Sequence, residues 1–130
     1  MLYNDAALIN FDEPNAINFE LLISHLNDLL NKKVTVIPKF DLGSCVVTKM
    51  LTVDPSKYKY IILEGVFILC NEALLRLCNL KIWTECSEYV CALRRFMKYT
   101  RDIHGYTPDF VYNQCVKFVI PGLFNIRINF

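Results

Sequence analysis

The stretch Tyr60-Ile61-Ile62-Leu63-Glu64-Gly65 decides the fold class of this sequence. Its first four residues form a continuous apolar run, which is typical of a strand that is covered on both faces in a parallel sheet. The glutamate and glycine that follow mark the carboxyl end of the run. A second short run, residues 80–84, has the same apolar character. We therefore predict two buried strands of a mainly parallel sheet.

Helices are predicted between and around these runs. After residue 18, apolar side chains recur at spacings of three and four, which indicates an amphipathic helix. A short helix is expected through Leu77, and another that carries Arg94. The last helix begins with a proline at its first position and is expected to end before Pro121. Each helix follows a residue that can cap it: Asn18, Asn71, Ser87 and Thr107.

Residues 34–38 alternate apolar with other residues, which is typical of a strand, and a turn-like segment follows. Residues 45–53 can form a returning strand, so a β-hairpin is predicted. Asp54-Pro55-Ser56 ends the second strand. Strands that alternate with helices, together with this hairpin, indicate an α/β layered domain.

Composition limits the classes of function. The chain has 130 residues, 54% of them hydrophobic, and a formal net charge of +1, so we expect one globular domain and no nucleic-acid partner. No apolar stretch approaches the length of a membrane span. The six cysteines form no C-x-x-C pair, which disfavours a zinc site. The first residues lack a secretion signal, so a cytoplasmic protein is expected.

Several short motifs are similar to those of one kinase family. Asn10-Phe11-Asp12-Glu13-Pro14-Asn15-Ala16 resembles N-[FY]-D-H-P-x-A, and residues 36–41 resemble the turn I-P-x-Y-D. Residues 62–66 resemble the strand end L-E-G-I, and residues 80–83 resemble K-I-F-V. Further matches lie later in the chain. Arg94-Arg95, Arg101-Asp102 and Gly105 resemble R-R-x-x-R-D-x-x-x-R-G-R with altered spacing. Gln114 and Pro121 match a Q-Y…P pair of the family.

In this order and with these gaps, the motifs resemble the uridine/cytidine kinase family of P-loop nucleoside kinases, over about residues 10–123. Nicotinamide riboside kinases share only the Asp12-x-Pro14 and Glu64-Gly65 features. The resemblance implies a P-loop-kinase-like parallel sheet flanked by helices, with the hairpin as an insertion, in a single partial domain over residues 1–130. It also implies the family reaction of pyrimidine salvage, in which ATP phosphorylates uridine or cytidine with Mg²⁺.

The family's phosphate cradle, G-x-x-x-x-G-K-[ST], has no counterpart here. None of the four glycines is followed by lysine. The family's general base is an Asp in a D-x-[FY]-Y segment, and Leu2-Tyr3 resembles only its last two positions. We therefore expect a truncated chain or pseudokinase, from a shortened gene or a misplaced gene start. It would lack the P-loop segment and the C-terminal helix, bind neither Mg²⁺ nor ATP, and be inactive alone.

The resemblance assigns substrate contacts to five residues. Asp12 would accept hydrogen bonds from a ribose hydroxyl, and Arg95 would touch the same sugar. Phe40 and Cys45 align with the base pocket, where the family has Tyr and His. Gln114 is the fifth substrate contact.

Three further residues are expected near phosphate and metal. Lys98 and Arg101 would close over the phosphates, although His104-Gly105-Tyr106 replaces the R-G-R of the family. Glu64, at the carboxyl end of a predicted strand, would reach the magnesium shell through water.

Each assignment has a simpler structural explanation. Asp12 could shape a turn before Pro14, and Glu64 could be a solvated strand end. The basic residues would then form a solvated helix face, Phe40 and Cys45 would be packing residues of a hairpin, and Gln114 an exposed helix residue. A second class of function also stays open, a non-catalytic interaction or nucleoside-binding protein that acts with a full-length paralogue.

In related kinases the strand that enters the cradle lies between the strands that match residues 60–63 and residues 80–84. No residues here supply it. Each unpaired buried backbone group costs on the order of 1–3 kcal/mol, against roughly 5–15 kcal/mol for a whole domain. We therefore expect the isolated chain to self-associate, to be poorly soluble, or to depend on a partner.

Overall fold

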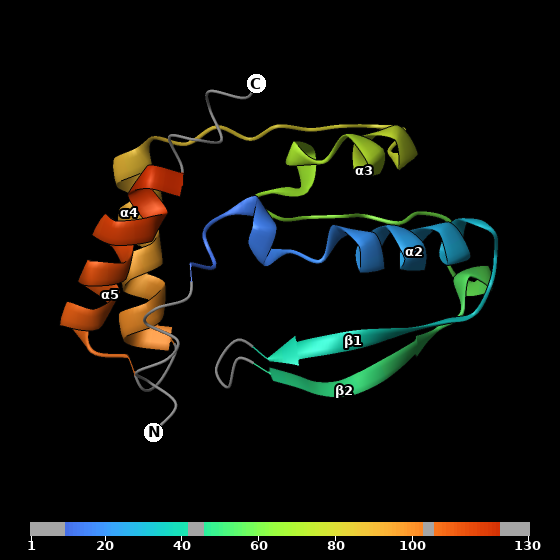
Figure 1. Ribbon diagram of the computed structural model, residues 1–130, viewed down its shortest axis with the longest axis horizontal. Coiled ribbons are helices and arrows are strands. Elements are labelled where there is room, and N and C mark those ends of the chain that lie inside the picture. The colour runs from blue at the N-terminus through green and yellow to red at the C-terminus, as the bar shows by residue number, and fades with distance from the viewer. Residues whose placement is uncertain (1–9, 42–45, 103–105, 123–130) are drawn as a thin grey trace. The chain divides into compact units, whose positions relative to one another are not determined.

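The computed structural model describes residues 10–41, 46–102 and 106–122 (Figure 1). They belong to two compact units, each described by itself below. One unit is Asn18–Asn79, and the other combines Met1–Ile17 with Leu80–Phe130. None of the described helices is both long enough and apolar enough to cross a membrane.

In the unit Asn18–Asn79, helix α2 (Phe19–Leu30) begins at the predicted cap, where the Asn18 side chain accepts a hydrogen bond from the Leu21 N–H at 2.9 Å. Helix α3 (Glu72–Leu77) follows the predicted cap Asn71 in the same manner. The two helices pack against each other. Their buried apolar residues include Leu26 of α2 and Leu74 of α3, so the predicted apolar face of α2 does bury a side chain.

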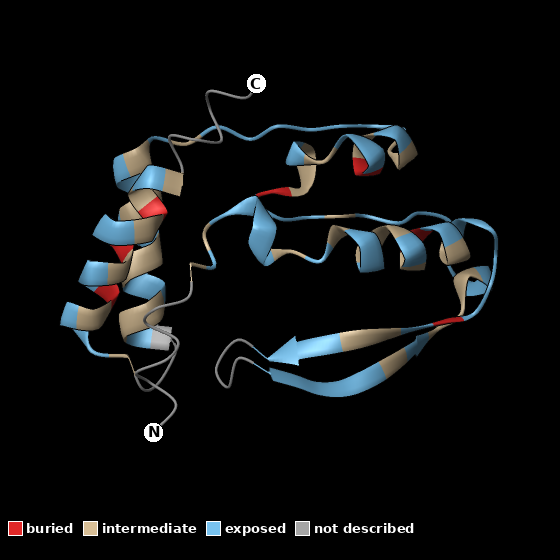
Figure 2. Cartoon of the chain, in the orientation of Figure 1, coloured by how far each residue is buried: buried red, intermediate tan, exposed pale blue. Residues whose placement is uncertain are grey.

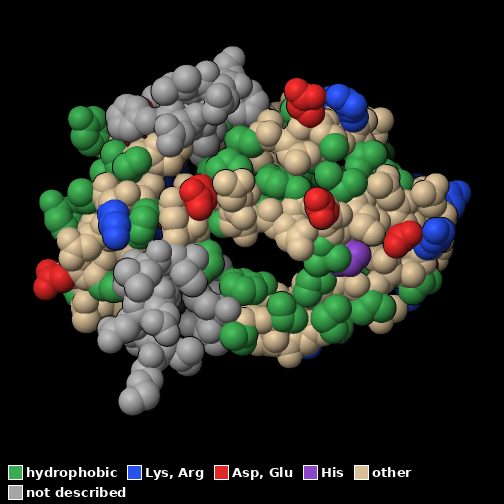
Figure 3. All heavy atoms as spheres, in the orientation of Figure 1, with side chains coloured by type: hydrophobic (Ala, Val, Ile, Leu, Met, Phe, Trp, Pro, Cys, Tyr) green, Lys and Arg blue, Asp and Glu red, His purple; other side chains and the backbone are tan. Residues whose placement is uncertain are grey.

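The same unit contains a two-stranded antiparallel sheet of β1 (Thr35–Asp41) and β2 (Val46–Val53). Thr35 lies opposite Val53 at one end, and the register shifts between Lys39 and Phe40. Most of the side chains on both strands are exposed, as Figure 2 shows. Hydrophobic side chains accordingly appear at the surface over the pair in Figure 3. The four residues between the strands lie outside the described part.

Neither of the two predicted parallel strands is a strand in the structure. Within the described residues the sheet consists of β1 and β2 alone, and residues 60–63 and 80–84 belong to no ladder. Ile62 is 89% exposed and Leu80 is 76% exposed. Trp83, also predicted to be buried, is exposed. An apolar run becomes a buried strand only when neighbouring strands satisfy its backbone groups, and the described residues provide no such neighbours.

The second unit is built on two helical rods. Helix α4 (Glu88–Met97) begins at the predicted cap Ser87 and continues as the π-helix η4 (Lys98–Asp102). Helix α5 (Pro108–Gln114) begins at the predicted cap Thr107 and continues as the π-helix η5 (Cys115–Val119). The rods lie side by side and run in opposite directions (Figure 1).

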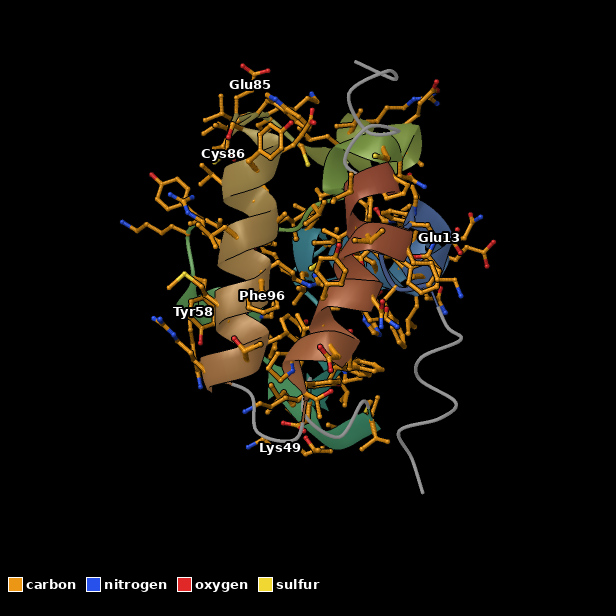
Figure 4. All side chains as sticks on the ribbon, turned by 90° about the vertical axis from the view of Figure 1, so that its left-hand side faces the viewer. Glu13, Lys49, Tyr58, Glu85, Cys86 and Phe96 are labelled. Carbon is orange, nitrogen blue, oxygen red and sulfur yellow. The ribbon has the colours of Figure 1, made fainter. Side chains whose placement is uncertain are left out.

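The core of this unit lies between the two rods. Val111, Cys115 and Val119 are buried, and aromatic side chains from both rods pack against them. Figure 4 shows one of these, Phe96, pointing from α4 toward α5. The buried residues recur every four positions, the spacing that keeps them on one face of the helix.

The prediction that the last helix ends before Pro121 is wrong, because the backbone stays helical through Gly122. In η5 the Ile120 N–H donates to the Cys115 carbonyl, a spacing of five residues. The usual hydrogen bonds to the carbonyl four residues back are therefore already interrupted before Pro121, which has no N–H. This interruption reduces the free-energy cost of a proline inside the helix.

Candidate functional site

The central contact of the candidate site joins two of the residues singled out from the sequence. Arg95 Nη2 donates a hydrogen bond to Asp12 Oδ2 at 3.2 Å, and the two residues form an ion pair across 83 positions of sequence. The Asp12 side chain is 17% exposed and that of Arg95 33%. The pair is thus partly shielded from water, which strengthens its electrostatic attraction relative to a surface pair.

Asp12 is held by its backbone as well as by its carboxylate. Its N–H donates to Asn10 Oδ1 at 3.0 Å, so the Asn10 side chain shapes the turn before the short 3₁₀-helix η1 (Pro14–Ala16). The carboxylate of Asp12 takes no part in that turn and is directed to Arg95. The simpler explanation, that Asp12 itself shapes the turn, therefore does not account for its side chain.

Asp12 retains capacity to bind a further group. Within the described residues, Arg95 donates to the Oδ2 atom of this carboxylate. The Asp12 side chain is 17% exposed, so it is not sealed off from solvent. A carboxylate with one oxygen on a guanidinium can accept a hydroxyl from a ligand with its other oxygen.

Arg95 is placed by helix α4 and by an aromatic ring one turn later. Its guanidinium carbon lies 4.6 Å from the centre of the Tyr99 ring, a cation–π contact at the i, i+4 spacing of a helix. Tyr99 meets the Tyr106 ring edge-on at 5.6 Å, and Tyr106 stacks on Phe110 at 5.3 Å. This row of rings connects Arg95 to the core of the unit.

The buried thiol of Cys115 lies within the electrostatic reach of the pair. Burial raises the pKa of Cys115 above its ordinary value of 9.0, the Arg95 guanidinium opposes that rise, and the Asp12 carboxylate adds to it. The two ionic side chains therefore lie on the side of the unit where the core packs.

The other basic residues of this segment do not join the pair. Lys98 and Arg101 are exposed on η4, and Arg94 Nη1 lies 3.8 Å from the Cys86 sulfur near the start of α4. Gln114 is half-buried at the last position of α5. The structure thus pairs Arg95, and not Arg94, with Asp12.

The ion pair does not test three other predicted site residues. Phe40 on β1 and Glu64 belong to the unit Asn18–Asn79, and both are exposed. Cys45 lies outside the described residues. Within the unit that holds them both, the structure brings together Asp12 and Arg95.

The residues present here do not match the phosphate cradle with which related kinases bind ATP. Among the residues that the structure covers, no three His, Cys, Asp or Glu side chains gather into one cluster. Glu64 is exposed and begins no helix whose N–H groups could bind phosphate. With no lysine after any glycine, the 130 residues offer no phosphate cradle.

Sequence reasoning missed two residues at this site. Tyr99 could have been found, because it lies four positions after Arg95 on a predicted helix. Gly122 could not: an ideal Cβ placed on it would lie 2.5 Å from the Asp12 carbonyl oxygen, a contact across 110 positions that no local pattern indicates.

Comparison with known proteins gives one consistent result. The model of the family described as "Phosphoribulokinase / Uridine kinase family" matches residues 3–126. A "Probable uridine-cytidine kinase" of Caenorhabditis elegans is 34% identical over 113 residues, which are 87% of this chain and 44% of that protein. A "Uridine kinase" of Staphylococcus aureus is 31% identical over 121 residues, 93% of this chain and 58% of that protein. The chain spans about half the length of the curated relatives it matches.

Proposed function

The chain belongs to the phosphoribulokinase/uridine kinase family, and on that premise we propose that it is a pyrimidine-nucleoside-kinase-like protein whose Asp12 and Arg95 bind the ribose of uridine or cytidine. The observation that carries the proposal is the 3.2 Å ion pair between these residues. The resemblance to the family implies a sugar contact for both residues. Because Arg95 binds only the Oδ2 atom, the carboxylate can accept a sugar hydroxyl with its other oxygen while Arg95 orients it.

The proposal includes the finer features that the family implies. Residues 60–63 and 80–84 would be strands of a parallel sheet when the strands that lie beside them in related kinases are present. The hairpin of β1 and β2 would then be an insertion that carries Phe40 and Cys45 to the base, and Gln114 would be a further contact. We propose the cytoplasm and pyrimidine salvage as the setting of this activity.

We propose further that a polypeptide of these 130 residues does not transfer phosphate by itself. Phosphoryl transfer depends on positioning and on neutralising the charge of the phosphates. The exposed Lys98 and Arg101 supply positive charge but no fixed cradle. Glu64 alone does not make a metal site, so no step of a phosphoryl transfer is assigned to these residues.

A second function merits a test because of one observation, the exposure of apolar side chains such as Ile62 and Leu80. Apolar segments at the surface favour association with another chain. On this alternative the chain is a non-catalytic nucleoside-binding or interaction protein that acts with a full-length paralogue.

The proposal is tested by calorimetry of the 130-residue chain with uridine, cytidine and ATP separately. We expect binding of a pyrimidine nucleoside that Asp12→Asn weakens, and no binding of ATP. Ribose and free uracil in separate titrations report whether the sugar or the base carries the affinity. Tight binding of ATP without binding of either nucleoside would contradict the assignment of the site.

A further inference from the structure

The end of the last helix lies directly against the backbone of Asp12. An ideal Cβ at Gly122 would be 2.5 Å from the Asp12 carbonyl oxygen, 3.6 Å from its carbonyl carbon and 3.7 Å from its Cβ. Real Cβ atoms essentially never come closer than 3.0 Å to another heavy atom, so any side chain at position 122 would displace the Asp12 backbone. The atom in the way belongs to the main chain, which cannot rotate aside as the end of a flexible side chain can.

Conformational freedom does not explain this glycine. Gly65 is the only described glycine with a positive φ, and Gly122 continues the helical backbone after η5. It is therefore not the left-handed residue that commonly ends a helix. Glycine is a poor helix former compared with alanine, so at this position it lowers local helix stability. What it provides here is space.

The space at Gly122 adjoins the backbone of the residue that supplies the carboxylate of the ion pair. The Asp12 backbone is fixed on one side by the Asn10 side chain, at 3.0 Å, and its carboxylate is fixed by Arg95, at 3.2 Å. Gly122 forms the third side of this arrangement. To bring the contact from 2.5 Å to 3.0 Å, a residue with a Cβ must move the carbonyl by at least half an ångström. Charge-assisted hydrogen bonds depend strongly on distance and angle.

We propose that Gly122 is a positioning residue for the candidate site: the missing side chain at 122 lets the last helix hold Asp12 where its carboxylate meets Arg95. The inference rests on the proposed function only for its consequence in nucleoside binding. The positioning of the pair itself can be measured without a ligand.

The deciding variant is Gly122→Ala, because helix propensity and the close contact predict opposite signs. Propensity alone predicts a more stable protein. We expect instead a lower urea midpoint than that of the unchanged chain. Asn113→Ala, an exposed substitution on α5 of the same rod, serves as the matched control and should leave the midpoint unchanged or raise it. An increase in Gly122→Ala as large as that in the control would overturn the proposal.

A merely structural role is separated from positioning by a double-mutant cycle. The coupling between Asp12→Asn and Arg95→Met is measured once in the unchanged background and once in the Gly122→Ala background. We expect a clear coupling with glycine at this position and its loss with alanine. An equal coupling in both backgrounds would show that Gly122 does not position the pair.

Nucleoside binding provides the link to function. If the unchanged chain binds uridine or cytidine, Gly122→Ala should weaken that binding roughly tenfold, the effect of losing about one charged hydrogen bond. Equal binding by the two proteins would refute the inference and leave the proposed function intact. If the unchanged chain binds neither nucleoside, the proposed function fails, while the coupling experiment still tests Gly122.

A measurement on the unchanged protein covers the case in which Gly122→Ala does not fold. The close approach predicts a nuclear Overhauser effect between the Asp12 Hβ protons and a Gly122 Hα proton, since a Cβ on Gly122 would lie 3.7 Å from the Asp12 Cβ. Its absence, with both spin systems assigned, would overturn the proposal.

Discussion

Asp12 and Arg95 are joined by a 3.2 Å ion pair although 83 positions separate them in the sequence. The contact connects the segment before α2 to helix α4 within one compact unit. Its two side chains are neither fully exposed nor fully buried. We therefore place its contribution between that of a surface pair, about 0–1 kcal/mol, and the roughly 3–5 kcal/mol lost when a buried pair is broken.

Arg95→Met should lower the free energy of unfolding by about 1–3 kcal/mol, because it leaves the Asp12 carboxylate without its cation in a partly shielded place. It should also weaken binding of uridine or cytidine by roughly tenfold or more, the equivalent of one charged hydrogen bond. Urea unfolding and calorimetry measure the two effects.

Arg94→Met is the matched control for this change. It removes the same charge from the neighbouring position, where the guanidinium lies 3.8 Å from the Cys86 sulfur. It should change the free energy of unfolding by no more than about 0.5 kcal/mol, as most surface substitutions do. Equal losses in the two variants would mean that net charge, and not the pair with Asp12, is responsible.

The ring of Tyr99 is expected to matter more than its hydroxyl. Tyr99→Phe keeps the ring face on which Arg95 lies and the edge contact with Tyr106. We therefore expect it to change the free energy of unfolding by less than about 0.5 kcal/mol. Tyr99→Leu removes the cation–π contact and the ring pair and should lower the free energy of unfolding by about 1–3 kcal/mol. Nucleoside affinity should follow the same order. If Phe is as harmful as Leu, the hydroxyl has a role that this geometry does not explain.

Cys115 should make stability decrease at alkaline pH. Burial raises the pKa of its thiol above the ordinary 9.0, with Arg95 opposing and Asp12 adding to the rise. The folded chain thus holds this proton more tightly than the unfolded chain does. The resulting stability is complete below the unfolded pKa and is lost as the pH rises from about 9 through the higher folded pKa.

Urea midpoints of the unchanged chain and of Cys115→Ala, compared from about pH 7 to about pH 10, isolate this effect, because titration of tyrosines and lysines is common to both proteins. The stability advantage of the cysteine protein should shrink toward the alkaline end. A difference that stays constant across this range would contradict the assignment.

Local signals predicted the helices well. The caps Asn18, Asn71, Ser87 and Thr107 all accept the expected backbone hydrogen bonds. Capping depends on residues only two or three positions apart, so a sequence contains the necessary information. The antiparallel strands β1 and β2 likewise overlap the two segments predicted as strands, although β1 continues three residues past the predicted end at Pro38.

Non-local features were predicted less well. The apolar run through Ile62 has the residue pattern of a buried strand. A strand also requires hydrogen-bonded partner strands, which the described residues do not provide. At the candidate site, the resemblance selected Asp12 and Arg95, which pair in the structure, whereas Gly122 depends on how the end of the last helix packs on Asp12. Such contacts arise from tertiary packing and leave no periodic signal in the sequence.

A polypeptide of these 130 residues should show no ATP-dependent phosphorylation of uridine or cytidine above a control without protein. The reason is chemical: no glycine is followed by lysine, and Lys98 and Arg101 lie exposed on η4. A radiolabelled phosphate-transfer assay on material free of host kinase measures this. An Asp12→Asn variant prepared in parallel identifies contamination, since a host enzyme would give the same rate in both preparations. Turnover that Asp12→Asn abolishes would refute the prediction.

The last prediction concerns association, and it follows from the two apolar segments that form no strand. Tyr60 and Ile62 are 84% and 89% exposed, and Leu80 and Ile82 are 76% and 70% exposed. Each fully exposed Leu or Ile forgoes about 1.5–3 kcal/mol of burial, and exposed apolar backbone segments readily pair with another chain. We therefore expect the isolated chain to elute as oligomers in size-exclusion chromatography and to unfold over a broad temperature range.

Ile62→Lys with Ile82→Lys should shift the elution toward the monomer, because a charge opposes burial in an interface. Asn79→Lys, which adds the same charge at an exposed polar position beside Leu80, should leave the oligomers in place. A monomeric unchanged chain with one sharp cooperative transition would show that these segments satisfy each other within a single molecule, and that association is not required.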